Sequence, residues 1–246
     1  MPYNKKNLLF NSKFGDCYLS VGVNTCRPSF MSTSNSLLKE KERMLEDCGM
    51  KVSKRRKGES GYGGKKEINV INSLGDTELK DLYDSYSNEE LLRTAEEKDL
   101  ILLYLDDGSW HKRSELMHLY CNELTENELK ALADRVEELY GTRPTLRWDK
   151  KKDGRSFPYF YFPRKLVDTV RDRWFEYVKE RNMKDLYYKF GGEDYVNYSG
   201  NKATKEIADK IRKDYFDNGI PINELIHKYE LRYVTIDNII KNKTFT

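Results

Sequence analysis

The sequence predicts an α+β fold in which one αββαββα unit occurs twice and is followed by a small all-α domain. Two apolar stretches, 8–16 and 100–108, each reach an acid beside a glycine, and these acids, Asp16 and Asp107, are 107 − 16 = 91 residues apart. Each stretch is followed by the same order of hairpin, helix, hairpin and helix. Repetition of this kind indicates an internal duplication.

In the first copy, alternating apolar and polar residues predict strands, and 3.6-residue periodicity predicts helices. The expected elements are, in order, strands at 18–21 and 29–33, a helix at 36–48, strands at 51–57 and 67–71, and a helix at 77–86. Ser34 to Ser36 provide an N-cap region for the first of these helices, and Gly49 stands where its C-cap belongs.

The second copy repeats this order after Gly108. Its expected elements are a hairpin with a return strand at 116–120, a helix at 125–140, strands at 145–152 and 156–162, and a helix starting near Arg164. Thr125 is the expected N-cap of the long helix and Gly141 its C-cap.

The tail is different in composition. We expect the domain boundaries 1–98, 99–189, 190–202 and 203–246, in which the third segment is a glycine- and asparagine-bearing linker. Three short helices, near 203–217, 221–231 and 232–243, have helix-turn-helix spacing, and the third would enter a major groove. A helical cap that packs on the main domain is the alternative.

The composition indicates a soluble globular protein, with 38% hydrophobic and 35% charged residues. No apolar run approaches a membrane span, and the apolar patch at 8–10 soon meets Lys13 and Asp16, so we expect no signal peptide and a cytoplasmic protein. The four cysteines form no CxxC pair, and there are only three histidines. We therefore expect reduced thiols and no zinc site.

The net charge of +3 hides an uneven distribution. Residues 51–66 hold seven Lys/Arg against one Glu, and residues 143–189 hold fourteen Lys/Arg against seven acids, many of them next to aromatic residues. Residues 76–107 are acidic, with eleven Asp/Glu against three Lys/Arg. The basic clusters are typical of a polyanion partner. A solvated hairpin face is the other interpretation of each cluster.

The stretch LILLYLDDGS, Leu100 to Ser109, is the candidate functional element. A helix C-terminus carries partial negative charge, so Asp106 and Asp107 are unfavourable there unless something positive, such as a metal ion, lies beside them. A core helix that ends in an Asp-Gly turn is the alternative on this stretch alone. If the duplicated helices pack side by side, Asp16 and Asp107 meet on a pseudo-two-fold axis. Hard oxygen ligands of this kind suit Mg²⁺, which can activate water at a phosphodiester.

The duplication also predicts two four-stranded sheets whose strands are rich in Arg, Lys, Asn, Thr and Tyr. Such sheets can straddle duplex DNA, with β-ribbons in the major groove and lysines on phosphates. The candidate DNA contacts lie on these strands and turns and on the third tail helix: Asn24, Arg27, Ser32, Lys54, Arg55, Arg56, Lys57, Lys112, Arg113, His118, Tyr120, Asn122, Arg147, Lys150, Lys151, Lys152, Arg155, Arg232, Tyr233, Thr235, Asn238 and Lys241.

Four short segments of the sequence resemble those of a known protein family. The YLDDGS end of the motif, MHLYCNELT, the KKDGR turn and the YFYFP strand resemble the second repeat of the LAGLIDADG homing endonucleases. The resemblance covers roughly residues 8–180, and the tail is similar to helix-turn-helix modules of mobile phage endonucleases. It implies a monomeric enzyme of two pseudo-symmetric halves, acting in a bacterial or phage-infected cell.

The resemblance also implies roles for single residues. The acid before the motif glycine is the metal ligand, here Asp107 rather than Asp106, and FGDCYLS makes Asp16 its counterpart. The first motif departs from the pattern, since Cys17 replaces the usual glycine and residues 11–13 are polar. Family members place a basic residue near the active centre, for which Lys165 is our candidate, with Arg164 as the alternative.

The implied activity is Mg²⁺-dependent, sequence-specific double-strand cleavage of a long DNA target, as in intron homing. Each aspartate would serve one strand and leave short 3′ overhangs. Two alternatives remain open: a maturase of the same fold that binds a group I intron RNA, and a DNA-binding regulator that does not cut.

Overall fold

A computed structural model of the chain describes residues 2–59, 67–150, 154–192 and 203–244, and it describes side chains in these ranges except those of 54–59 and 67. The first copy comprises α1 (Lys5–Phe14), β1 (Cys17–Val21), β2 (Cys26–Ser32), α2 (Asn35–Asp47), β3 (Val52–Glu59), β4 (Glu67–Ser73), α3 (Thr77–Ser85) and α4 (Asn88–Arg93). The second comprises α5 (Glu97–Asp107), β5 (Gly108–His111), β6 (Leu116–Tyr120), α6 (Glu126–Tyr140), β7 (Thr145–Lys150), β8 (Ser156–Tyr161), α7 (Arg164–Glu180) and the 3-10 segment η1 (Lys184–Phe190).

Both copies build an antiparallel four-stranded sheet with the same strand order. The orders are β1-β2-β4-β3 and β5-β6-β8-β7, so the second hairpin of each copy adds to the inner strand of the first. In the first sheet Phe30 is opposite Ile71, and in the second Leu119 is opposite Phe160; all four side chains are buried. The predicted duplication and the α+β fold class are therefore confirmed.

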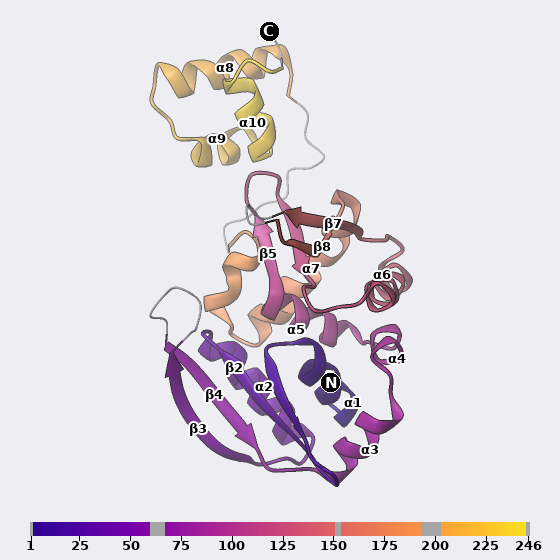
Figure 1. The fold of residues 1–246 in the computed structure, drawn as a ribbon. Helices are drawn as coiled ribbons and strands as arrows, with labels where there is room; N and C mark the ends of the chain where they lie inside the picture. Colours follow the sequence, from indigo (N-terminus) through magenta and orange to yellow (C-terminus); the bar gives the residue numbers. More distant parts are fainter. Residues whose placement is uncertain (1, 60–66, 151–153, 193–202, 245–246) are drawn as a thin grey trace. The chain divides into compact units, whose positions relative to one another are not determined.

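The first helices of the two copies, α1 and α5, pack against each other where the copies meet (Figure 1). Every residue of α5 from Asp99 to Leu105 is buried, so this helix is covered on all sides, as expected for a helix in the middle of a core. In α1 the stretch Leu8 to Phe10 is buried as well. The run of apolar residues before Asp107 therefore serves the interface between the copies.

Polar residues also lie in this interface. Asn7 and Asn11 of α1 are buried and donate hydrogen bonds to the carboxylate of Asp99 on α5. Asp99 Oδ2 additionally accepts the backbone N–H of Glu96 at the start of α5. One of the polar residues that make the first motif atypical, Asn11, thus pairs with an acid of the second motif helix.

Local signals placed most elements correctly. Thr125 caps α6 in a capping box, and Gly141 ends it with φ 66°, as predicted. Helix α4, which begins with a capping box made by Ser87 and Glu90, was not predicted from the sequence. Most of the expected linker, residues 193–202, lies outside the described residues.

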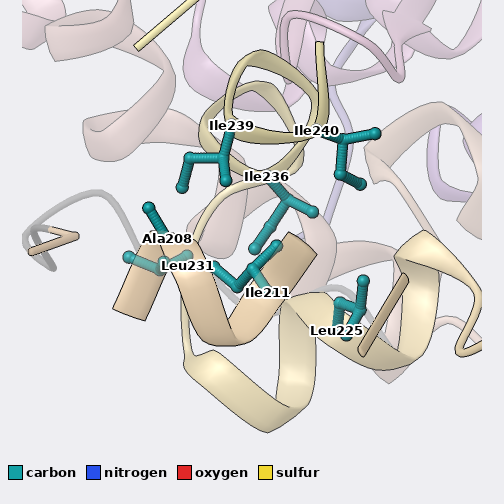
Figure 2. Close-up of a cluster of buried hydrophobic side chains, with 7 residues drawn as sticks. All are labelled: Ala208, Ile211, Leu225, Leu231, Ile236, Ile239 and Ile240. Carbon is teal, nitrogen blue, oxygen red and sulfur yellow. The ribbon is translucent and has the colours of Figure 1, made fainter. Parts of the chain in front are cut away.

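The chain divides into two compact units, residues 1–109 with 117–190, and residues 110–116 with 191–246. The second unit contains α8 (Lys205–Phe216), α9 (Ile222–Tyr229) and α10 (Tyr233–Ile240), close to the three predicted helices. Figure 2 shows its core, which is formed by Ala208, Ile211, Leu225, Leu231, Ile236, Ile239 and Ile240. The segment 110–116, which runs from the end of β5 to the start of β6, groups with this unit, whereas the sequence-based boundaries place it in the second repeat.

Two sequence expectations concern the whole chain. No helix in the described ranges is long and apolar enough to cross a membrane. Cys17, Cys26, Cys48 and Cys121 are free thiols in the structure.

Candidate active site

The two motif aspartates line one cavity. Asp16 follows the end of α1, and Asp107 is the last residue of α5, so the packing of these helices brings the two acids to the same end of the helix pair. A cavity of about 270 Å³ opens there, and its walls come from both copies. It is lined by Lys13, Phe14, Gly15, Asp16, Cys17, Met31, Leu103, Asp107, Tyr120, Cys121, Asn122, Glu123 and Leu124.

The two carboxylates interact electrostatically. The pKa of Asp107 is raised to about 7, first by burial and then by the negative charges of Asp16 and Asp106, which together outweigh the opposing charges of Lys189 and Lys41. The pKa of Asp16 is also raised, first by burial and then by Asp106, although part of the residue reaches solvent. Like charges held this close favour protonation or a bound cation.

Asp106 turns away from solvent and forms a buried ion pair with Lys41 of α2. Lys41 Nζ lies 2.6 Å from Oδ1 and 2.7 Å from Oδ2 of Asp106, and both side chains are 0% exposed. Asp106 Oδ2 also accepts the backbone N–H of Asp16 at 3.1 Å. Its carboxylate is therefore fully used by protein donors, which supports the preference for Asp107 over Asp106 as a metal ligand.

A second buried lysine covers the C-terminus of α5. Lys189 Nζ donates to the carbonyl oxygens of Asp106, at 3.1 Å, and Gly108, at 2.9 Å. Burial lowers the pKa of Lys189, while Asp106, Asp107 and Asp16 raise it. Because a cation is favourable at a helix C-terminus, Lys189 and Lys41 supply at least part of the positive charge that the sequence led us to expect beside the paired acids.

Gly108 permits the sharp exit from α5. A Cβ at this position would lie 2.2 Å from Cδ2 of Tyr104 and 2.4 Å from its carbonyl oxygen. Tyr104 is itself buried, and its hydroxyl donates to the Lys189 carbonyl. The motif glycine is thus required by close packing at the point where α5 passes into β5.

The donor set at the cavity fits a hard divalent cation. Asp16 and Asp107 both line the cavity and offer carboxylate oxygens, the ligand type that Mg²⁺ prefers. Within the described ranges, no cluster of three or more His, Cys, Asp or Glu side chains could hold a metal. Any ion here would therefore take its other ligands from water or from a bound polyanion.

The basic residues at this site differ from the one we expected. Lys165 is an exposed residue in the first turn of α7, and the lysines whose charges act on Asp16 and Asp107 are Lys41 and Lys189. These two are stronger candidates than Lys165. One signal could have identified Lys41, since it occupies the apolar stripe of α2, four residues after Leu37 and three after Leu38. We find no sequence signal for Lys189.

The open face of the second sheet carries an aromatic and basic ladder. The His118 ring lies 5.1 Å from that of Tyr159 and 5.8 Å from that of Tyr161, and Tyr120 lies 5.8 Å from Tyr159. The guanidinium of Arg147 is 3.9 Å from the centroid of Tyr161. Three predicted DNA contacts, His118, Tyr120 and Arg147, thus share one face with two tyrosines that the prediction did not include.

Several of the other predicted DNA contacts do not lie on this open face of the second sheet. Arg27 and Asn24 are exposed on the first hairpin, and Asn122 lines the cavity. Ser32 is only 8% exposed and accepts the Ser34 N–H, so the structure places it on the core side of the sheet rather than on a DNA-binding face. Lys150 is exposed, but the alternation of β7 places it on the face opposite Arg147.

The remaining predicted DNA contacts lie on the hairpins of the two sheets. Arg155 lies with its guanidinium 5.6 Å from the Phe157 ring centroid, and Lys112 is exposed. The side chains of Lys54, Arg55, Arg56 and Lys57, and the whole of Lys151 and Lys152, lie outside the described residues.

In the second unit, the predicted reading residues lie on and next to α10, and three of them bind acids. Arg232 Nε lies 2.8 Å from Glu115 Oε2, and the Tyr233 N–H donates to Glu115 Oε1 at 3.0 Å. Asp237 is paired with Lys241 at 2.6 Å and with Arg113 at 3.3 Å. Thr235 and Asn238 are half-buried.

No protein-family model matches the sequence, and no curated protein is similar to it. Among solved structures, the homing endonuclease I-WcaI bound to its DNA recognition sequence superposes with a TM-score of 0.57 at 14% identity, over 77% of this chain and 88% of that one. I-DmoI in complex with its target DNA in the presence of Mg has a TM-score of 0.45 at 15% identity, over 68% and 94%. Full-length DUF199/WhiA from Thermatoga maritima has a TM-score of 0.42 at 11% identity, over 97% and 89%.

The similarity to I-WcaI covers 77% of this chain and 88% of that one. The protein therefore has the LAGLIDADG homing endonuclease fold, as its sequence motifs indicated.

Proposed function

We propose that the protein is a divalent-metal-dependent DNA endonuclease that cuts both strands of a specific duplex target. The observation that carries the proposal is the convergence of Asp16 and Asp107, from the two copies of the motif, on one cavity, where the charge of Asp16 helps to raise the pKa of Asp107. I-WcaI, which has the same fold, is a homing endonuclease described as bound to its DNA recognition sequence.

Asp16 and Asp107 would hold Mg²⁺. When bound, the metal would supply an activated water and stabilise the leaving oxygen of a phosphodiester. Lys41 and Lys189 hold the two motif ends in place from inside the protein, and neither has an exposed ammonium group that could reach a phosphate. Each aspartate would serve the cleavage of one strand, so a double-strand break needs both copies.

The open faces of the two sheets would bind the duplex. On the second sheet, Arg147 and His118 present donors beside the rings of Tyr159 and Tyr161, a combination suited to phosphates and base edges. The helices α8 to α10 would add a second DNA contact. We further propose that the protein acts as a monomer, because both halves of the site are in one chain.

The test is cleavage of a plasmid that carries the uninterrupted form of the locus in which the reading frame lies. Wild-type protein in Mg²⁺ should linearise it, whereas Asp107→Asn should cut at least about a hundredfold more slowly, since it removes a metal ligand. Glu126→Gln, which neutralises an exposed acid in the first turn of α6, is the matched control and should cut like wild type.

The results separate the alternatives. Equal cleavage by Asp107→Asn and wild type would contradict the proposed role of the aspartate. Tight DNA binding that is independent of Mg²⁺ and leaves both strands intact would indicate a regulator instead. Preferential binding of a group I intron RNA in the same filter assay would indicate a maturase.

A further inference from the structure

We propose that Lys41 and Asp106 form a positioning pair that holds the Gly15–Asp16 backbone against the second motif helix and so sets the Asp16 carboxylate. Neither residue would touch the metal or the DNA. The inference deepens the proposed nuclease function, and it rests on that function only where cleavage is measured.

The Asp106 carboxylate connects the Lys41 ammonium group to the backbone of the first motif. Asp106 Oδ2 accepts the Asp16 N–H at 3.1 Å, and both oxygens of the same carboxylate accept from Lys41 Nζ. A buried carboxylate without a partner would be strongly unfavourable, and so would a buried ammonium group. Each member of the pair therefore restrains the other, and Asp106 has little freedom to leave the Asp16 backbone.

Gly15, at the end of the first motif helix, is closely packed against the Asp106 carboxylate. A Cβ on Gly15 would lie 2.4 Å from Asp106 Oδ2 and 2.9 Å from the Asn11 carbonyl oxygen. Gly15 has φ −98°, a conformation open to any residue, so glycine here is explained by the close approach of the Asp106 carboxylate rather than by its backbone angles. The absence of a side chain at Gly15 makes room for the pair.

The duplication does not repeat the Lys41–Asp106 ion pair. With an offset of 91 residues, the counterpart of Lys41 is 41 + 91 = 132, and that of Asp106 is 106 − 91 = 15. These residues are Leu132, which is buried, and Gly15. The ion pair thus exists on one side of the pseudo-two-fold axis only. It holds the aspartate of the atypical first motif, in which residues 11–13 are polar.

Two double variants test the pair without leaving a charge unpaired in the core. Lys41→Met/Asp106→Asn removes both charges but keeps an acceptor oxygen for the Asp16 N–H. Lys41→Met/Asp106→Ala removes the charges and the acceptor. Because replacing a buried ion pair by neutral residues is often close to neutral for stability, both proteins should fold. The two variants differ mainly in the hydrogen bond to Asp16.

The first measurement is amide hydrogen exchange at Asp16 by NMR, which needs neither DNA nor metal. Exchange in the Asp106→Ala double variant should be at least about tenfold faster than in the Asp106→Asn double variant, the fold-change that corresponds to a lost hydrogen bond of about 1.4 kcal/mol. Equal protection of the Asp16 amide in the two variants would overturn the proposal.

The second measurement is the cleavage rate of each DNA strand, labelled separately. The strand served by Asp16 is the one that Asp16→Asn slows more. The Asp106→Ala double variant should slow this strand about tenfold more than the other, whereas the Asp106→Asn double variant should keep the wild-type ratio. Equal slowing of both strands would overturn the positioning role. If wild type cuts no DNA, the proposed function fails, and the amide measurement still decides whether the pair holds the Asp16 backbone.

Discussion

The buried carboxylate of Asp99 should make the stability of the main unit depend on pH. Asp99 is 3% exposed and accepts hydrogen bonds from Asn7 Nδ2 at 3.0 Å, Asn11 Nδ2 at 3.2 Å and the Glu96 N–H at 2.9 Å. Burial raises its pKa from 3.8 to about 6, against the hydrogen bonds, which lower it. The perturbation is Asp99→Asn, which keeps the shape and removes the titration.

The magnitude follows from the difference between the two pKa values. Going from 3.8 to about 6 at 1.36 kcal/mol per pH unit gives about 3 kcal/mol. Because the folded state binds this proton more tightly than the unfolded state, the stabilisation is complete below pH 3.8 and is lost as the pH rises through 6. Roughly half of the loss falls between pH 5 and pH 8.

The assay is urea unfolding at pH 5, 6, 7 and 8 for wild type and Asp99→Asn. The raised pKa values of Asp16 and Asp107 act in the same direction, but both are present in the two proteins, so the difference between the two pH profiles isolates Asp99. Wild type should lose on the order of 1 kcal/mol more unfolding free energy than the variant from pH 5 to pH 8. Parallel pH profiles would refute the reasoning.

Two further predictions use substitutions at positions other than Asp99 and its hydrogen-bond donors. Gly15→Ala should lower the unfolding free energy by about 1–3 kcal/mol, because its Cβ would overlap the Asp106 carboxylate; a melting temperature equal to that of wild type would contradict the close packing. Arg147→Ala should weaken DNA binding by about 1–3 kcal/mol and reduce the slope of log K against log salt by about 0.9 if Arg147 contacts a phosphate. Arg143→Ala, which removes an exposed arginine paired with Asp134 and Glu137, is its control in the same filter-binding series and should leave the slope unchanged.

Local sequence signals were sufficient for most of the architecture. Thr125 and Gly141 bound α6 because capping and left-handed backbone are properties of a few neighbouring residues. Strand alternation predicted the open face of the second sheet, where Arg147 and His118 do lie. It did not predict that Ser32 faces the core, because the strand has serine on both of its faces and the alternation is weak there.

The sequence by itself determined that the chain is duplicated, that each copy ends its first helix near an acid, and that these acids belong together. Both the 91-residue offset between the two acids and the apolar run before Asp107 can be read directly along the chain. Only the tertiary structure decided which charges surround the acids. Lys41 and Lys189 come from α2 and η1, 65 and 83 residues from Asp106 in sequence. A lysine becomes a buried partner only when distant elements fold around it, and no local pattern specifies which acid it will meet.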